Sequence, residues 1–180
     1  FFLALYGLRQ WRQELRGRTE LDAAREIVRG IIEVRNAIGQ CRVPVTFISE
    51  FSDRERDSAE TDSEAMALNE EYAYRKRLGQ LTTAMLKFET AAIAAEVLWG
   101  AKVTQVRSEI IVLHNRLMKD FTAYFQNAQR DARAGRDTHE DWVEAERTVL
   151  FAAISDDFGA EFKDAISRAI SAFDNYLLSK

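Results

Sequence analysis

The sequence has few of the residues that break or cross-link a chain: its 180 residues include one proline, one cysteine and eight glycines. A single cysteine excludes an internal disulfide and favours a reducing, cytosolic setting. So little proline and glycine leaves few turns for a many-stranded sheet, which favours long helices with few connections. The eight glycines are also isolated from one another, which excludes a glycine-rich phosphate-binding loop.

The overall charge is weak, at -4, although 30% of the residues are charged and 47% are hydrophobic. That much apolar material is enough for one core in a chain of this length, so we expect a single globular domain. A mildly acidic balance argues against a nucleic-acid partner, because neutralising phosphates requires clustered lysine and arginine on the body of the domain.

Apolar residues recur at helical spacing along most of the chain. The pattern predicts a first helix over residues 9–42 that Pro44 ends, with a possible kink near Gly17 and recapping at Thr19 or Asp22. A second helix should start at Asp62 or Ser63 and run to residue 99. Its apolar positions alternate in steps of four and three, which is the strongest periodic signal in the sequence: Tyr74, Leu78, Leu81, Met85, Phe88, Ala92, Ala95 and Trp99.

A helix stop at Gly100 predicts a tight antiparallel hairpin to a third helix. The apolar stripe of that third helix is Val103, Val106, Ile110, Leu113, Leu117 and Tyr124. Two charged loops are expected, one at about 50–63 that we predict to be acidic and mobile, and one at 131–141. A helix over 141–155 follows, then a break at 156–159 and a helix to the C-terminus. The fold class is therefore all-α, a bundle of four to five helices.

Catalytic chemistry finds little support in the sequence. A di-iron bundle needs two Glu-x-x-His motifs, and neither His114 nor His139 has a glutamate three residues before it. Glu89 and Glu96 lie seven apart on the second helix, so with His114 they form the one candidate for a small-ligand site inside the bundle. Cys41 is expected to be inert. We predict no catalytic, cofactor-binding or metal-binding residue and no enzymatic activity.

The N-terminus is apolar and then abruptly basic. Residues 1–8 carry no charge, and residues 1–18 hold four arginines against the single Glu14. Such a pattern is typical of the cytoplasmic end of a transmembrane helix, although eight residues alone cannot span a bilayer. We therefore expect residues 1–8 to end a span that begins before Phe1, and residues 9–180 to form the helical domain. The predicted interface with anionic lipid consists of Leu8, Arg9, Trp11, Arg12, Arg16 and Arg18.

Several segments also resemble a family of bacterial proteins of unknown function. These segments are WRQELRGRTELDAAREIVRGIIEVRNAI from Trp11, RVP ending at Pro44, FISE ending at Glu50, AAEVLWG ending at Gly100 and DDFGAEFKDAISRAI from Asp156. They cover under half of the chain, in order. The resemblance implies one N-terminal transmembrane helix followed by a cytosolic helical domain, and it supplies no catalytic residue.

The sequence thus favours a non-enzymatic interaction or scaffold domain tethered to the cytoplasmic face of a bacterial inner membrane. It would bind a protein partner or a second copy of itself. Two alternatives stay open. One is a soluble helical homo-oligomer that uses residues 1–15 as its contact, and the other is a bundle that binds a small ligand near His114, Glu89 and Glu96.

Overall fold

The computed structural model describes residues 2–134, 150 and 156–177, and for residues 2–9 and 13 the backbone alone. Every regular element in these ranges is an α-helix, which confirms the predicted all-α class. The helices are α1 (Phe2–Cys41), α2 (Ile48–Phe51), α3 (Asp62–Trp99), α4 (Ala101–Arg133), α6 (Asp157–Ser171) and α7 (Asp174–Leu177).

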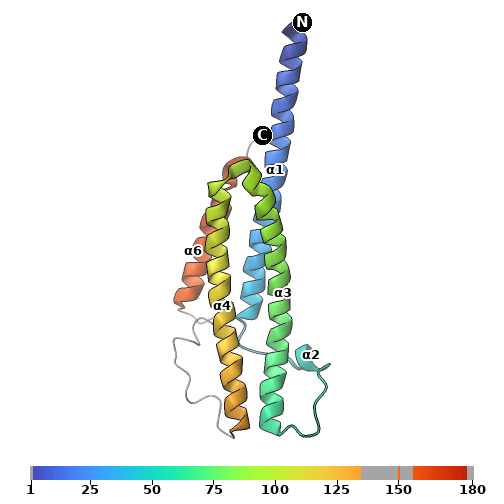
Figure 1. Ribbon diagram of the computed structural model, residues 1–180, viewed down its shortest axis with the longest axis vertical. Coiled ribbons are helices and arrows are strands. Elements are labelled where there is room, and N and C mark those ends of the chain that lie inside the picture. Colours follow the sequence, from blue (N-terminus) through green and yellow to red (C-terminus); the bar gives the residue numbers. More distant parts are fainter. Residues whose placement is uncertain (1, 135–149, 151–155, 178–180) are drawn as a thin grey trace.

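The four longer helices form an antiparallel bundle (Figure 1). Helix α1 packs mainly on α3, α3 and α4 form a hairpin, and α6 returns against α1 and α4. The N-terminal part of α1 projects beyond the bundle at the end where α3 turns into α4. At the opposite end the α3–α4 hairpin extends past the end of α1, beside the segment that carries α2.

The predicted apolar stripes form the core. On α3 the residues at steps of four and three are buried, apart from Leu78 and Trp99, which are half-buried. All six stripe residues of α4 are buried. Gly100 joins the two helices at φ 49°, a conformation that L side chains rarely adopt, and its N–H donates to the Glu96 carbonyl at 2.8 Å. The predicted hairpin at Gly100 is confirmed.

Helix α3 starts at Asp62, as predicted, but a different residue caps it. Thr61, not Asp62 or Ser63, caps the helix, because its hydroxyl accepts from the Glu64 N–H at 3.2 Å. The Glu64 carboxylate in turn accepts from the Thr61 N–H at 3.0 Å, so the two residues form a reciprocal capping box. The break predicted at 156–159 is right only at Asp156, whose side chain caps α6 through the Gly159 N–H, because residues 157–159 already belong to the helix.

Two other details were wrong. Helix α1 is continuous through Gly17. Thr19 does not recap the helix, because its hydroxyl donates to the Leu15 carbonyl one turn earlier in the same helix. The last helix is interrupted after Ser171, where a tighter turn inserts Phe173 into the core at 5.3 Å from the Trp99 ring. Apart from residue 150, the predicted helix over 141–155 lies outside the described residues, as does most of the predicted loop over 131–141. The start of that loop was wrong, because residues 131–133 belong to α4.

Helices α1 and α3 approach each other closely at Gly30 of α1. A Cβ atom at this position would lie 2.9 Å from the Phe88 Cα of α3, so any side chain would push the helices apart. Phe88 is fully buried, and the contact therefore lies in the centre of the α1–α3 packing.

We expect Gly30→Ala to lower the free energy of unfolding by about 1–3 kcal/mol, because the backbone of α3 must move to accept the methyl group. Gly39→Ala is the control, since a Cβ there meets nothing within 4 Å. That substitution should be neutral or raise stability by up to about 1 kcal/mol. Urea unfolding of both variants measures the difference, and equal effects would contradict close packing at Gly30.

The segment after α1 is held by the buried side chain of Arg77, which is 6% exposed on α3. Its guanidinium donates to the Val43 and Val45 carbonyls at 2.8 and 2.7 Å. It also binds both carboxylate oxygens of Glu50, at 2.7 and 2.6 Å. The Tyr74 hydroxyl donates to the same Val43 carbonyl at 2.8 Å. One cation therefore fixes the chain on both sides of Pro44.

A second buried arginine joins the end of α1 to the start of α6. Arg42 donates to the Asp156 carboxylate at 2.8 Å, and both side chains are 7% exposed. The guanidinium also lies over the Phe158 ring, 4.9 Å from its centre. The RVP and FISE segments, which are neighbours in the sequence, thus meet through Arg77, and the distant DDFG segment joins them through Arg42.

Replacing Arg77 by Met should destabilise the protein by about 2–4 kcal/mol, because the Val43 and Val45 carbonyls and the Glu50 carboxylate each lose the hydrogen bonds from this buried cation. The neighbouring Lys76→Met is the matched control. Lys76 pairs with Asp53 at 2.6 Å in the open, and such exposed pairs contribute at most about 1 kcal/mol. Thermal and denaturant unfolding test the ranking, and a loss in K76M as large as in R77M would refute it.

Candidate functional site

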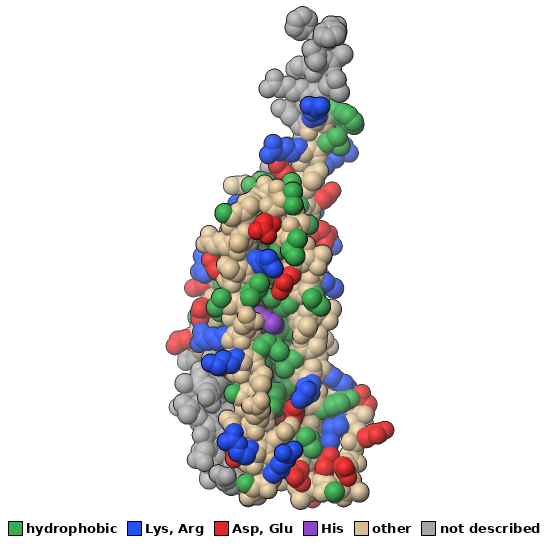
Figure 2. Space-filling view, in the orientation of Figure 1, with side chains coloured by type: hydrophobic (Ala, Val, Ile, Leu, Met, Phe, Trp, Pro, Cys, Tyr) green, Lys and Arg blue, Asp and Glu red, His purple; other side chains and the backbone are tan. Residues whose placement is uncertain are grey.

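The projecting part of α1 carries exposed apolar side chains. Trp11 and Leu15 are 58% and 45% exposed, and among the side chains of α1 that the structure describes, Ala24 is the first that is fully buried. At a rise of 1.5 Å per residue, Trp11 lies about 20 Å along the helix from Ala24. Figure 2 shows this stem standing clear of the bundle, with basic side chains along it. The stem is therefore amphipathic and is accessible to a partner or a surface beyond the bundle.

The predicted interface residues share this stem. Arg12, Arg16 and Arg18 are all exposed. Arg16 forms an ion pair with Glu20 at 2.9 Å, and the Arg16 side chain stays 79% exposed. Arg12 and Arg16 lie one turn apart, beside the face that carries Trp11 and Leu15. The side chains of Leu8 and Arg9 lie outside the described residues. Within the described part of the chain, no helix contains a stretch long and apolar enough to cross a bilayer.

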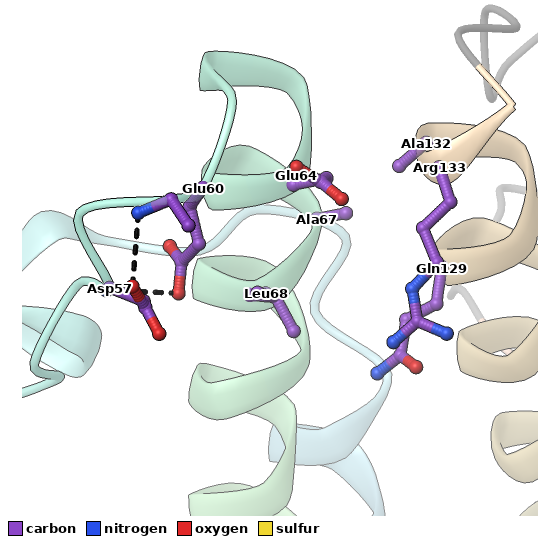
Figure 3. Close-up of a pocket in the computed structure, with 9 residues that line it drawn as sticks. Asp57, Glu60, Glu64, Ala67, Leu68, Gln129, Ala132 and Arg133 are labelled. Atoms are coloured by element: carbon purple, nitrogen blue, oxygen red, sulfur yellow. Dashed lines mark hydrogen bonds between the residues drawn. The ribbon is translucent and has the colours of Figure 1, made fainter.

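A pocket of about 260 Å³ lies at the opposite end, between the acidic loop and the α3–α4 hairpin. Figure 3 shows Gln129 and Arg133 extending from α4 toward Glu64 and Leu68 of α3, with Asp57 and Glu60 on the loop side. The lining thus combines three carboxylates with one guanidinium and contains neither a histidine nor a hydroxyl or thiol nucleophile. Carboxylates can act as general acids, bases or nucleophiles, so what matters is whether these three are free to react.

The carboxylates of this pocket are already bound within the protein. Arg54 forms two hydrogen bonds to Glu60, at 3.0 and 2.7 Å, and a third at 2.6 Å to Asn69 of α3. The Arg54 hydrogen bonds lower the pKa of Glu60 to about 2. The pKa of Glu64 is also lowered, first by the Thr61 backbone N–H of the capping box. The acidic loop predicted at 50–63 is present, and these bonds attach it to α3.

The lowered pKa of Glu60 predicts an acid-sensitive loop. The carboxylate stabilises the fold above its unfolded pKa of about 4.5, and this contribution is lost as the pH falls from about 4.5 to about 2. We therefore expect Glu60→Gln to be less stable than the parent at pH 7 and equal to it near pH 2. Glu55→Gln, a change at an exposed position of the same loop, is the control. Unfolding followed at a series of pH values measures both, and a constant gap between E60Q and the parent would contradict the assignment.

A second, larger groove of about 410 Å³ runs between α3 and α4. Leu78, Met118, Phe121 and Phe125 provide its apolar lining. One end is closed by Glu71, a buried carboxylate that binds Arg75 at 2.6 Å and also accepts from Gln129. Figure 2 shows hydrophobic side chains in this hollow, with a histidine directly above them. The groove can hold apolar side chains but has no free charged group at its centre.

The structure does not bring Glu89, Glu96 and His114 together. Glu89 lies 3.4 Å from Arg107, and Glu96 accepts from the Thr104 hydroxyl at 2.6 Å. The His114 ring contacts Asn115 through Nδ1 at 3.2 Å. Each glutamate is thus bound by α4 on its own, so the predicted ligand cluster does not form. In the described part of the chain, no group of three or more His, Cys, Asp or Glu side chains could hold a metal ion.

The thiol of Cys41 is fully buried, and burial raises its pKa to about 12. A thiol that stays protonated near neutral pH is a poor nucleophile, so the burial of Cys41 supports the prediction that it is inert. The two buried arginines were not predicted as key residues. The only signals in the sequence were that Arg42 lies two residues before the only proline and that Arg77 directly precedes Leu78 of the α3 stripe.

Comparisons with known proteins found no protein-family model, no curated protein and no solved structure that matches this chain. The resemblance described above therefore stays a prediction. A proposal for the function therefore rests on the fold and on the exposed surfaces.

Proposed function

We propose that this chain is a non-enzymatic helical interaction domain held at the cytoplasmic face of a bacterial inner membrane by its N-terminal helix. The single observation that carries the proposal is the stem of α1, where exposed Trp11 and Leu15 lie beside exposed arginines outside the bundle. Tryptophan favours the headgroup layer, and arginine favours the cytoplasmic side of it.

The length of the stem supports this arrangement. With Trp11 among the headgroups, the start of the core at Ala24 would stand about 20 Å below them, so the bundle would lie in water. Because α1 is one continuous helix, its orientation in the membrane would be transmitted to the bundle without a flexible hinge.

The charge distribution also supports attachment of the stem to the membrane. Residues 1–18 are net positive, whereas the whole chain has a net charge of -4, so the rest of the chain is acidic. Anionic lipid would attract the stem and repel the body. The grooves between α3 and α4 would then face the cytosol, where a partner can reach them.

Vesicle flotation tests the attachment. We expect the chain to bind vesicles that contain anionic lipid, and Arg12→Glu/Arg16→Glu to weaken this binding by about 30-fold or more, since each arginine near the surface contributes roughly 1 kcal/mol. Arg29→Glu/Arg35→Glu makes the same charge change at exposed positions of α1 beside the bundle and is the matched control. That variant should bind within a few-fold of the parent.

Two outcomes would contradict the proposal. One is equal weakening in the two double variants, which would reduce the effect to net charge. The other is recovery of the full-length protein in the soluble fraction of cells without detergent. If deletion of residues 1–8 instead converts a defined oligomer to a monomer in sedimentation, the stem is a protein contact, as in the soluble homo-oligomer that the sequence left open.

A further inference from the structure

Helix α3 has a second apolar stripe, on the face that points away from the core. Leu86, Ile93 and Val97 are 64%, 55% and 87% exposed on this face. With the exposed Thr83 and Thr90, these residues follow one another at steps of three, four, three and four. The spacing is that of a coiled-coil seam, and the core stripe of the same helix uses the opposite face.

The threonines of this stripe present methyl groups. The Thr83 hydroxyl donates to the Gly79 carbonyl at 3.0 Å and the Thr90 hydroxyl to the Leu86 carbonyl at 2.8 Å, so both polar groups are satisfied inside the helix. Burying either side chain would therefore leave no hydroxyl without a partner.

The charged residues beside the stripe are paired within the chain. Lys87 binds Glu33 of α1 at 3.0 Å on one side, and Glu89 contacts Arg107 of α4 at 3.4 Å on the other. A helix that lay on the stripe would thus meet an uncharged centre with neutralised edges. Because α1 and α4 occupy the two sides of α3, the stripe itself stays uncovered by the described helices.

We propose that this stripe pairs in parallel with the same stripe of a second copy of the chain, as a short two-stranded coiled coil. The spacing allows one heptad assignment, with Thr83, Thr90 and Val97 at a and Leu86 and Ile93 at d. Every a residue is thus β-branched, and the d residues are large aliphatic ones. Parallel two-stranded coiled coils favour β-branched a residues with leucine at d.

The extent of the stripe sets its strength. From Thr83 to Val97 it is about 21 Å long, two heptads, which is short for a stable interface on its own. We therefore expect a weak, concentration-dependent dimer. A parallel pair also sends both stems out from the same end, so it is compatible with membrane attachment, where a shared surface would raise the effective concentration, but does not depend on it.

Disulfide trapping in solution, without lipid, tests the pairing. Thr83→Cys should give a disulfide-linked dimer on oxidation with copper phenanthroline, because equal a positions of a parallel pair lie about 6 Å apart. Cys41 is buried and serves as an unreactive background. Gln80→Cys, on the same helix but off the stripe, is the matched control and should stay largely monomeric.

The same cross-linking experiment also distinguishes a parallel from an antiparallel contact. Leu86→Glu, at an exposed position that the fold does not need, should lower the T83C cross-linked fraction by about tenfold, with an unchanged circular-dichroism melt. The proposal is overturned if T83C cross-links no better than Q80C, or if L86E has no effect. It is also overturned if T83C reacts only with Val97→Cys in a mixture, since that pair marks an antiparallel contact.

Discussion

Helix α1 is packed in the bundle at its C-terminal end and exposed at its N-terminal end. The rest of the structure depends on how the packed end is fixed. Two arginines fix it through charged hydrogen bonds. Arg77 gathers two carbonyls and the Glu50 carboxylate around the turn at Pro44, and Arg42 reaches Asp156 at the start of α6. A buried cation is costly unless every donor is used, so this turn has little freedom to take another path. The position of α1, and with it the direction of the stem, follows from that constraint.

The sequence predicted the long helices well because their determinants are local. The steps of four and three from Tyr74 to Trp99, Gly100 and Pro44 each act within a few residues. The ion pairs were not predictable, because Arg42 and Asp156 are distant in sequence and composition does not say which charges meet. The acidic loop illustrates this, since Arg54 binds Glu60 and Asn69 in a segment that composition alone describes as solvated. The expected cluster of Glu89, Glu96 and His114 failed for a similar reason, because α4 supplied nearer partners.

The geometry separates two kinds of surface. The stem carries tryptophan beside arginine, a combination that suits a lipid headgroup layer. The exposed stripe on α3 and the groove between α3 and α4 instead carry apolar side chains, which suit contacts with another helix. The two kinds of surface lie on different parts of the molecule, so attachment and association could act at the same time. Two carboxylates of the pocket, Glu60 and Glu64, already form hydrogen bonds within the fold.

The central claim is that the stem of α1 meets lipid while the bundle stays in water. Nitroxide labels at Trp11→Cys and at Arg35→Cys, read by electron paramagnetic resonance on vesicles with anionic lipid, test it most directly, since the buried Cys41 thiol does not take up label. The account predicts that the label at residue 11 becomes accessible to oxygen, which is concentrated in the bilayer, while the label at residue 35 stays accessible to a water-soluble nickel complex. A label at residue 11 that remains as water-accessible as the one at residue 35 would contradict it.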